Sequence, residues 1–203
     1  MKLLFPTVIH ELQVERYKSI KKDILKFVYE EQKKDPKGLT FSNRGGWQSG
    51  PHYHNENIIL STVTKTLLPY FSNNVLDMKK EIRCDGLWMN INKKGDYNVT
   101  HDHPCCHMAG VFWINSPKEG GGIFECQSPI SYALGPEIRV YTDDFKERTN
   151  CYGSYGFIPK EGTIMLFPAF LNHRVTPNTS NQDRISASFN LTFKLNAGKD
   201  WGV

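Results

Sequence analysis

Apolar residues recur at helical spacing in two segments of the first eighty residues. The first segment runs from about Glu15 to Lys33, and the second runs from about Glu56 to Tyr70. Residues three and four positions apart share one face of a helix, so each segment predicts an amphipathic helix that packs on another element. The apolar stripes consist of Tyr17, Ile20, Ile24, Phe27 and Val28 in the first helix and of Ile59, Val63 and Leu67 in the second.

From Glu81 onward the pattern changes to short alternating or apolar runs separated by Gly, Pro and Asn. Such runs, with turn residues between them, are typical of the strands of a sandwich or barrel. Residues 128–155 show no clear period and are expected to form an excursion or lid. The expected strands are Gly86–Asn92, Tyr97–His103, Met108–Asn115, Gly122–Cys126, Thr163–Pro168, His173–Pro177 and Arg184–Leu195.

The last of these runs has the clearest two-residue period, with one apolar face and one polar face. The apolar face should meet the predicted helices, and the polar face should line solvent or the mouth of a barrel. The sequence therefore predicts a mainly β fold with helical support at about 1–80 packed on one sheet of a β core at about 81–195. The apolar members are Ile185, Ala187, Phe189, Leu191, Phe193 and Leu195, and the polar members are Arg184, Ser186, Ser188, Asn190, Thr192 and Lys194.

The composition narrows the class of protein. The 203 residues are 39% hydrophobic and 23% charged, as in one globular domain spanning 1–203. No apolar run approaches the roughly 20 residues of a membrane helix, and the opening residues do not resemble a signal peptide. The net charge of +4, with lysines interleaved with acids, does not predict a nucleic-acid partner. The five cysteines, an odd number without a secretory signal, indicate reduced thiols and a cytoplasmic location, in the host if the protein is viral. The absence of a CxxC pair argues against a structural zinc knuckle.

Two histidines in the segment 98–104 begin a candidate metal site. His101 and His103 are two residues apart, so on an extended chain their side chains share one face, whereas Asp102 points to the other. His173, which begins a later expected strand, is the expected third ligand. Three ligands on one face leave open positions for substrate and oxygen, as in non-haem iron oxygenases. A bulge at the strand end would instead make Asp102 a ligand, and this alternative remains open.

The spacing of glycine and proline around these histidines favours a double-stranded β-helix, the cupin-like jelly roll. Gly95 precedes His101 by six residues, and Gly162 precedes Pro168 by six. His173 follows that proline by five residues, so the two half-motifs place all three histidines in one fold.

A candidate anion clamp follows eleven residues after His173. The guanidinium of Arg184 is suited to a two-pronged grip on a carboxylate, with the hydroxyl of Ser186 as a further donor. A surface ion pair with Asp183 is the alternative role for Arg184. Asn90 and Asn92 share a strand face and could hold the other end of the same ligand, or could satisfy hydrogen bonds of the sheet at a turn.

Several further residues are candidates for a substrate cleft or for the core. Trp47, His54 and His107 lie in expected loops, where binding residues concentrate, and packing is the alternative role for Trp47 and His107. Trp88 and Trp113 are expected in the core.

The sequence resembles the iron(II)- and 2-oxoglutarate-dependent oxygenases, in particular an uncharacterised family of such proteins from marine bacteria and tailed phages. The resemblance implies iron held by a His-x-Asp/Glu pair and a distal histidine, and an Arg-x-Ser clamp on the C5 carboxylate of 2-oxoglutarate. By position, His173 is the distal histidine and Arg184 and Ser186 are the clamp, whereas His103 stands where the superfamily has an acid. The resembling segments are SNRGGWQS at 42–49, LWMNINKKGDYNVTHDHP at 87–104, GVFWINSP at 110–117, and EGTIMLFPAFLNHRV and DRISASFN within 161–190.

Three functional hypotheses follow from these residues. The first is a dioxygenase that uses Fe(II), 2-oxoglutarate and O2 to hydroxylate an unidentified small molecule or protein side chain, with release of succinate and CO2. The second is a cupin-type dioxygenase with three histidine ligands, which would bind its substrate directly to iron and have no need of Arg184. The third is a non-catalytic, metal-stabilised jelly roll acting as a virion or adaptor protein. Exposed edge strands would also allow a homodimer.

Overall fold

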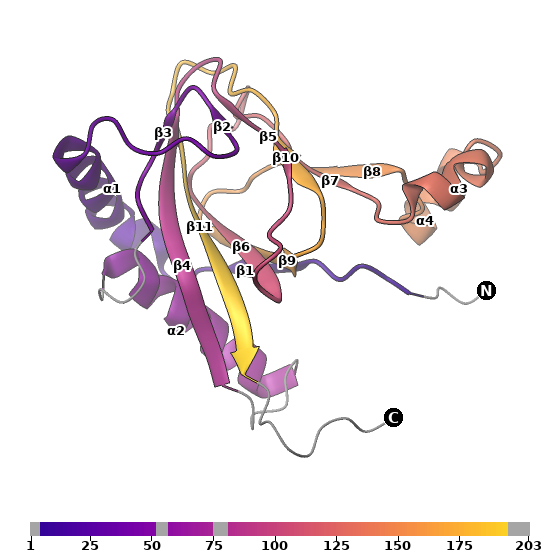
Figure 1. Cartoon of the computed structure of the whole chain (residues 1–203), viewed down its shortest axis with the longest axis horizontal. Coiled ribbons are helices and arrows are strands. Elements are labelled where there is room, and N and C mark those ends of the chain that lie inside the picture. The colour runs from indigo at the N-terminus through magenta and orange to yellow at the C-terminus, as the bar shows by residue number, and fades with distance from the viewer. Residues whose placement is uncertain (1–4, 52–56, 75–80, 195–203) are drawn as a thin grey trace.

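The computed structural model describes residues 5–51, 57–74 and 81–194 (Figure 1). Within these ranges the chain forms two antiparallel sheets and four helices. No helix in the described ranges is long and apolar enough to cross a membrane. The helices are α1 (Tyr17–Lys34), α2 (Ile58–Asn74), α3 (Ser131–Ile138) and α4 (Asp143–Thr149).

The strands of the two sheets interleave along the sequence, as in a jelly roll. The larger sheet has six strands in the order β1-β9-β6-β11-β4-β3, and the smaller has five in the order β2-β5-β10-β7-β8. The six strands of the larger sheet are β1 (His10–Gln13), β3 (Trp47–Gln48), β4 (Glu81–Asn92), β6 (Met108–Asn115), β9 (Thr163–Pro168) and β11 (Arg184–Lys194). The strands of the smaller sheet are β2 (Asn43–Arg44), β5 (Tyr97–His101), β7 (Phe124–Gln127), β8 (Ser154–Phe157) and β10 (His173–Val175).

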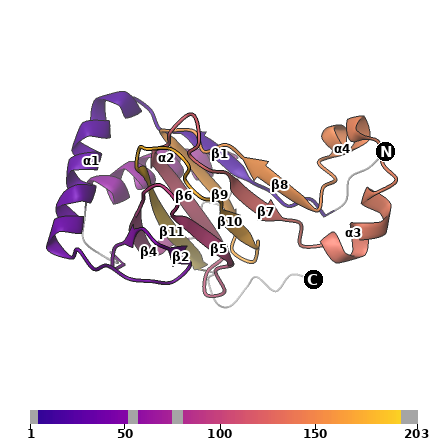
Figure 2. The same cartoon turned by 90° about the horizontal axis from the view of Figure 1, so that it is seen from above.

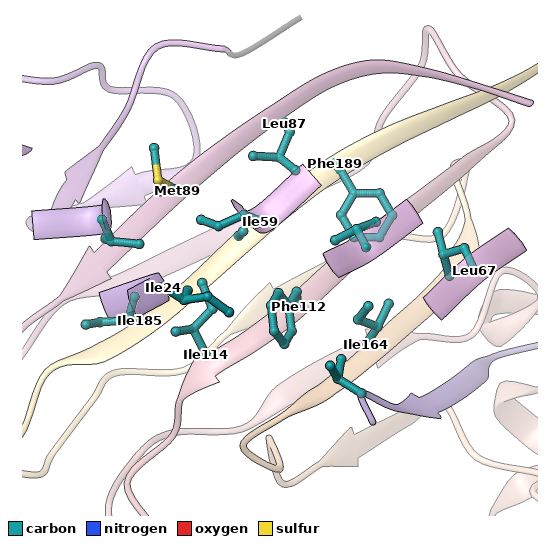
Figure 3. Close-up of a cluster of buried hydrophobic side chains, with 14 of the residues drawn as sticks. Ile24, Ile59, Leu67, Leu87, Met89, Phe112, Ile114, Ile164, Ile185 and Phe189 are labelled. Atoms are coloured by element: carbon teal, nitrogen blue, oxygen red, sulfur yellow. The ribbon is translucent and has the colours of Figure 1, made fainter. Parts of the chain in front are cut away.

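The outer face of the larger sheet packs on α1 and α2 (Figures 1 and 3). Ile24 of α1 and Ile59 of α2 are fully buried against Ile185 and Phe189 of β11. The expected apolar stripe of the second helix is confirmed, because Ile59, Val63 and Leu67 all belong to this core cluster. The amide oxygen of Asn57 begins this helix by accepting hydrogen bonds from the backbone N–H groups of Ile59 and Leu60.

The inner face of the larger sheet divides into an apolar half and a polar half. On β6 and β9, Val111, Trp113, Met165 and Phe167 pack against Phe124 of the smaller sheet. On β4 and β11 the inward positions carry the polar face of the sequence pattern, among them Asn90 and Ser186, which are Cα partners across the two strands. The space between the sheets is therefore lined by apolar side chains on the side of β6 and β9 and by polar side chains on the side of β4 and β11. The polar side is where a binding site can form.

The strands expected at Met108–Asn115 and Thr163–Pro168 have the predicted bounds, and the other expected strands differ by a few residues at their ends. The described part of the segment 5–74 is not purely helical. It also contains β1 and β3, which are strands of the larger sheet, and β2, which is a strand of the smaller sheet. These strands have two to four residues, too few to show a period in the sequence. Their backbone partners come from distant strands, as with His10 opposite Leu166.

The expected excursion at 128–155 contains two short helices rather than irregular chain. The hairpin of β7 and β8 carries α3 and α4 at the opposite end of the molecule from α1 (Figure 2). The hydroxyl of Thr142 caps α4 by accepting a hydrogen bond from the backbone N–H of Phe145.

A substitution at Gly110 of β6 tests how tightly side chains pack between the larger sheet and the helices. This glycine lies opposite Phe189 on β11, and a Cβ at this position would lie 2.3 Å from Cζ of that ring and 2.8 Å from Leu166 Cδ2. We expect Gly110→Ala to lower the free energy of unfolding by about 1–3 kcal/mol because a packed core cannot take an extra carbon. Urea denaturation measures the change. Gly153→Ala, where a Cβ meets nothing within 4 Å, is the control and should change stability by less than about 0.5 kcal/mol. Equal stabilities of the two variants would contradict this packing.

Candidate metal centre

Three histidines from two neighbouring strands converge between the sheets. His101 ends β5, His103 follows two residues later, and His173 begins β10 directly opposite His101. The ring centroid of His101 lies 4.3 Å from that of His173 and 5.3 Å from that of His103. Each ring offers one nitrogen to a common point, and these three atoms lie within 4.8 Å of one another. The spacing is compatible with a single ion bound by three imidazoles.

The hydrogen bonds of the rings decide which nitrogen is free. Nδ1 of His101 lies 2.8 Å from the carbonyl oxygen of Val99, and Nδ1 of His173 lies 2.8 Å from that of Leu171. Nδ1 of His103 lies 2.8 Å from Oδ1 of Asn190. A carbonyl oxygen only accepts, so each Nδ1 carries the proton and each Nε2 keeps a lone pair. The three rings are thus held in the tautomer that leaves Nε2 free to bind a metal ion.

Burial keeps these rings neutral. Desolvation, with a smaller contribution from the neighbouring imidazoles, lowers the pKa of His103 to about 4 and that of His173 to about 3. The pKa of His101 is also lowered, again mainly by burial. A neutral imidazole is the form that ligates metals, so the site is prepared for an ion at neutral pH.

Asp102 lies outside the cluster. Its side chain is exposed and, among the described residues, the group of His, Cys, Asp and Glu side chains that could hold an ion comprises only the three histidines. The backbone N–H of His103 donates to the carbonyl of Ala169 just beyond the end of β5, and the rings of His101 and His103 lie on the same side, with centroids 5.3 Å apart.

A small cavity of about 40 Å³ joins the histidines to the polar half of the larger sheet. Asn90, Ser186 and Ser188 line it from β4 and β11. The side-chain N–H of Asn90 donates to the hydroxyl of Ser188 at 3.3 Å, and Oδ1 of Asn90 is buried without a hydrogen-bond partner among the described residues. These polar atoms face a space that already contains the histidine cluster, so a ligand there would meet both.

The inward-facing polar residues of β4 and β11 form what we call the polar wall. Arg184 is buried at the end of this wall, with 1% of its surface exposed. Its Nη1 donates to the carbonyl oxygens of Gly121 at 2.8 Å and Thr176 at 2.9 Å. Its Nη2 is buried with no partner in the described part of the chain. Burial lowers the pKa of this guanidinium to about 10, a tendency opposed by the charge of Asp96, so it stays charged at neutral pH. A buried cation with an unused donor calls for an anionic ligand.

The alternative role expected for Arg184, a surface ion pair with Asp183, does not fit these contacts. Asp183 accepts instead a hydrogen bond from the hydroxyl of Tyr29 at 3.0 Å. Asn92, the Cα partner of Arg184, is buried, but it does not line the cavity, and its backbone oxygen accepts from Nδ2 of Asn178.

The other candidate residues fall in different places. Trp47 is buried in the helix-side core, where its indole N–H donates to the carbonyl of Asp35. His107 is exposed, and its Nδ1 accepts from the backbone N–H of Phe193. Neither residue lines the cavity, and His54 lies outside the described residues.

Several residues of the site were not identified as such from the sequence, among them Trp88 and Asn190. Trp88, expected in the core, is half-buried, lines the cavity and stacks on His103 with ring centroids 5.9 Å apart and planes at 21°. Asn190 fixes the ring of His103 from β11. The alternation of β11 put Asn190 on the polar face, but only the fold shows which histidine it meets. Trp113 is buried as expected, and it also lines the cavity.

Comparison with known proteins supplies independent information. A family model described as "Putative 2OG-Fe(II) oxygenase" matches residues 86–190. That segment contains the three histidines together with Arg184 and Ser186. A comparison with curated proteins finds no match.

Solved structures of low sequence identity share the fold. A viral collagen prolyl hydroxylase from Paramecium Bursaria Chlorella virus-1, in complex with 2-oxoglutarate, has a TM-score of 0.58 at 15% identity, over 92% of this chain and 96% of that one. A prolyl-4-hydroxylase from Pseudomonas putida has a TM-score of 0.60 at 10% identity, over 92% of both chains. HygX from Streptomyces hygroscopicus, with nickel, 2-oxoglutarate and hygromycin B bound, has a TM-score of 0.60 at 10% identity, over 92% of this chain and 83% of that one.

The lowered pKa values of the histidines predict acid sensitivity of the metal-free protein. The unfolded chain has ordinary imidazoles near pH 6.5 and binds protons there, whereas the folded chain does so only near pH 3 to 4 at His173 and His103. Stability should therefore be fully present above pH 6.5 and fall as the pH is lowered, by up to about 1.4 kcal/mol per pH unit for each such histidine. His10, whose pKa burial also lowers, adds to the effect.

Melting temperatures in EDTA at pH 7.5, 6.0 and 5.0 measure this dependence, in a range where most carboxylates remain ionised. His103→Gln, which removes one buried imidazole, should show a shallower decline. A melting temperature that is constant or rises toward pH 5.0 would show that the rings are not buried as neutral groups.

Proposed function

Since the chain belongs to the family of 2OG-Fe(II) oxygenases, whose members work with Fe(II), 2-oxoglutarate and O2, we propose that it is a dioxygenase that hydroxylates an organic substrate. In the overall reaction, one atom of O2 enters the substrate C–H bond as a hydroxyl group. The other enters succinate, which forms from 2-oxoglutarate with loss of CO2. The observation that carries this proposal is the joining of the histidine cluster and the polar wall by one cavity.

The proposed ligands of Fe(II) are Nε2 of His101, His103 and His173. Their fit rests on the donor set, because all three Nδ1 atoms are engaged with carbonyl oxygens, which leaves Nε2 as the free nitrogen of each ring, and the three histidines each offer a ligand nitrogen within 4.8 Å of the others. With His103 in place of the acid of the superfamily, the ligand set is neutral. The ion would then keep its full double positive charge, which favours anionic partners.

The proposed anchor of 2-oxoglutarate is Arg184 together with Ser186. The unused Nη2 of Arg184 and the hydroxyl of Ser186 are donors suited to a carboxylate, and Ser186 lines the cavity that contains the histidines. Asn90 is the Cα partner of Ser186 and could contact the same ligand through its amide. A cupin-type dioxygenase without 2-oxoglutarate would leave the buried Nη2 of Arg184 unpaired, so the contacts favour the 2-oxoglutarate-dependent reaction.

The bound iron would supply the redox chemistry that activates O2 and cleaves a substrate C–H bond. The contribution of the chain is to position the bound groups and to exclude water from them. Trp88 covers one face of His103, and Phe167 contacts both His103 and His173 at ring-centroid distances of 6.5 and 4.6 Å. These aromatic rings shield the ligand set from bulk solvent and keep it from rotating.

The substrate is a small molecule or a side chain of a protein in this proposal. We further infer a reducing, cytoplasmic setting, which the five cysteines support because none of them forms a disulfide.

The hydrogen bond from His103 to Asn190 predicts a metal-affinity variant. Asn190→Ala removes the acceptor that orients the ring, so the affinity for Fe(II) should fall about 10–100-fold. Asn190→Asp keeps an acceptor oxygen and should retain most of the affinity. Anaerobic calorimetric titration with Fe(II) measures each constant.

Thr192→Val, two residues further along β11, removes a buried hydroxyl that has no hydrogen-bond partner in the described chain, and it serves as the control. It should bind Fe(II) like the wild type. Wild-type affinity in Asn190→Ala would show that His103 is not a ligand or does not need this partner.

The binding of 2-oxoglutarate predicts a visible charge-transfer band in the anaerobic Fe(II) protein. The band should appear when 2-oxoglutarate is added to the wild type, should vanish in His103→Ala, and should need at least about tenfold more 2-oxoglutarate in Ser186→Ala and Arg184→Lys. Circular dichroism confirms that each variant is folded. Iron binding without a band in the wild type would refute the role of 2-oxoglutarate and favour a cupin-type or structural site.

A further inference from the structure

A cavity of about 620 Å³ lies beside the metal centre, under the hairpin that carries α3 and α4. We call it the lid cavity. Its walls are the N-terminal residues 5–9, the end of β7 with residues 128–130, the segment 149–157 that includes β8, and Leu171. A volume of this size suits a small organic molecule, whereas the 40 Å³ cavity at the histidines does not.

A row of paired residues connects the lid cavity to the metal centre. His173 is the Cα partner of His101 on one side and of Cys126 on the other, and Cys126 is the partner of Tyr155. Side chains that are directly opposite each other in antiparallel strands share one face, so all four lie on the same face of the smaller sheet. Strands lie about 4.8 Å apart, and Cys126, which lines the lid cavity, is therefore one strand from His173.

Aromatic rings follow the same path. The ring of Tyr152 lies 5.7 Å from that of Tyr155, which lies 4.8 Å from that of Phe157. Phe157 contacts Phe124 at 6.3 Å, and Phe124 contacts His173 at 5.3 Å. The lid cavity thus has a wall of ring faces that leads to a proposed metal ligand, and such faces bind other rings by stacking or edge contacts.

The lining of the lid cavity is uncharged. Among the described residues that form it, none is Asp, Glu, Lys, Arg or His. Four of the five charged residues of the adjacent α4 pair with one another, Asp143 with Lys146 and Asp144 with Arg148, each at 3.0 Å, and none of the five lines the cavity. The polar groups at the edge of the cavity are hydrogen-bonding amides and hydroxyls, from Thr7, Gln127, Ser128, Thr149, Asn150 and Ser154.

We propose that the lid cavity is the substrate compartment of the enzyme and that it takes an uncharged small molecule with a ring. A ring would lie against the aromatic wall, and its hydroxyl or carbonyl groups would meet the amides and hydroxyls. A charged group would be desolvated in this cavity without a counter-charge, which is strongly unfavourable. This inference rests on the proposed function, because the row of paired residues makes a compartment for oxidation only if the histidines bind the iron.

The test uses three probes of the same shape and different charge: benzamide, benzoate and benzamidine. Ligand-observed saturation-transfer NMR is recorded on the full chain with excess 2-oxoglutarate and Mn(II), so that benzoate does not bind in place of the cosubstrate. Benzamide should bind in the millimolar range, and the two charged probes at least about tenfold more weakly. Mn(II) should broaden the ring protons of bound benzamide, because the compartment lies next to the metal.

Two variants locate the binding. Tyr155→Ala removes part of the aromatic wall and should weaken benzamide binding about two- to tenfold. Asn150→Asp places a carboxylate in the lining without a change of shape and should shift the preference toward benzamidine. Asn181→Asp makes the same change outside the cavity and should leave the preference unaltered.

The outcomes separate the two claims. Equal binding of the three probes, no binding of benzamide, or no effect of Tyr155→Ala and Asn150→Asp would overturn the proposed compartment while leaving iron and 2-oxoglutarate binding intact. Selective benzamide binding without broadening by Mn(II), in a protein that demonstrably binds Mn(II), would place the probe elsewhere and also overturn it. Failure of both Mn(II) and Fe(II) to bind would instead refute the proposed function. Probe binding can still be measured on the metal-free protein, so the two claims are tested separately.

Discussion

The antiparallel pairing of β10 with β5 is the constraint on which the rest of the site depends. It places His173 opposite His101, so two imidazoles from segments seventy-two residues apart meet on one face of the smaller sheet. His103, two residues beyond the end of β5, joins them on the same side. The same pairing continues through β10 to β7 and β8, which places the lid cavity beside the histidines. The proposed metal ligation and the proposed substrate compartment are thus two consequences of one strand register.

The larger sheet supplies the polar residues of the site, because its outer face packs on the helices and its inner face is free to carry polar groups. The outward face of β11 is apolar and holds the helices, and this packing fixes the strand. The inward face can then carry polar groups whose positions are set by the buried backbone. Arg184, Ser186, Ser188 and Asn190 occupy successive alternate positions of this face. A hydrogen-bond donor to an anion, two hydroxyls and the hydrogen-bond partner of His103 are therefore held on one rigid strand.

The sequence predicts those features that depend on local periodicity or on spacing. The two-residue period of β11 identifies both of its faces, and the i, i+2 spacing of His101 and His103 places them together. Trp88 is expected in the core from the sequence, and only the stack on His103 shows its place in the site. The short strand β1 and the position of Trp47 depend on contacts with residues far along the chain, so no local pattern reports them. The lid cavity likewise combines four distant segments.

The most direct test of this account is an anaerobic crystal structure of the protein with Fe(II) and 2-oxoglutarate. We expect anomalous density for iron between the three histidine rings, within reach of Nε2 of each, with a carboxylate of 2-oxoglutarate bound to Arg184 and Ser186. Iron bound by the carboxylate of Asp102, or 2-oxoglutarate bound away from Arg184, would contradict it.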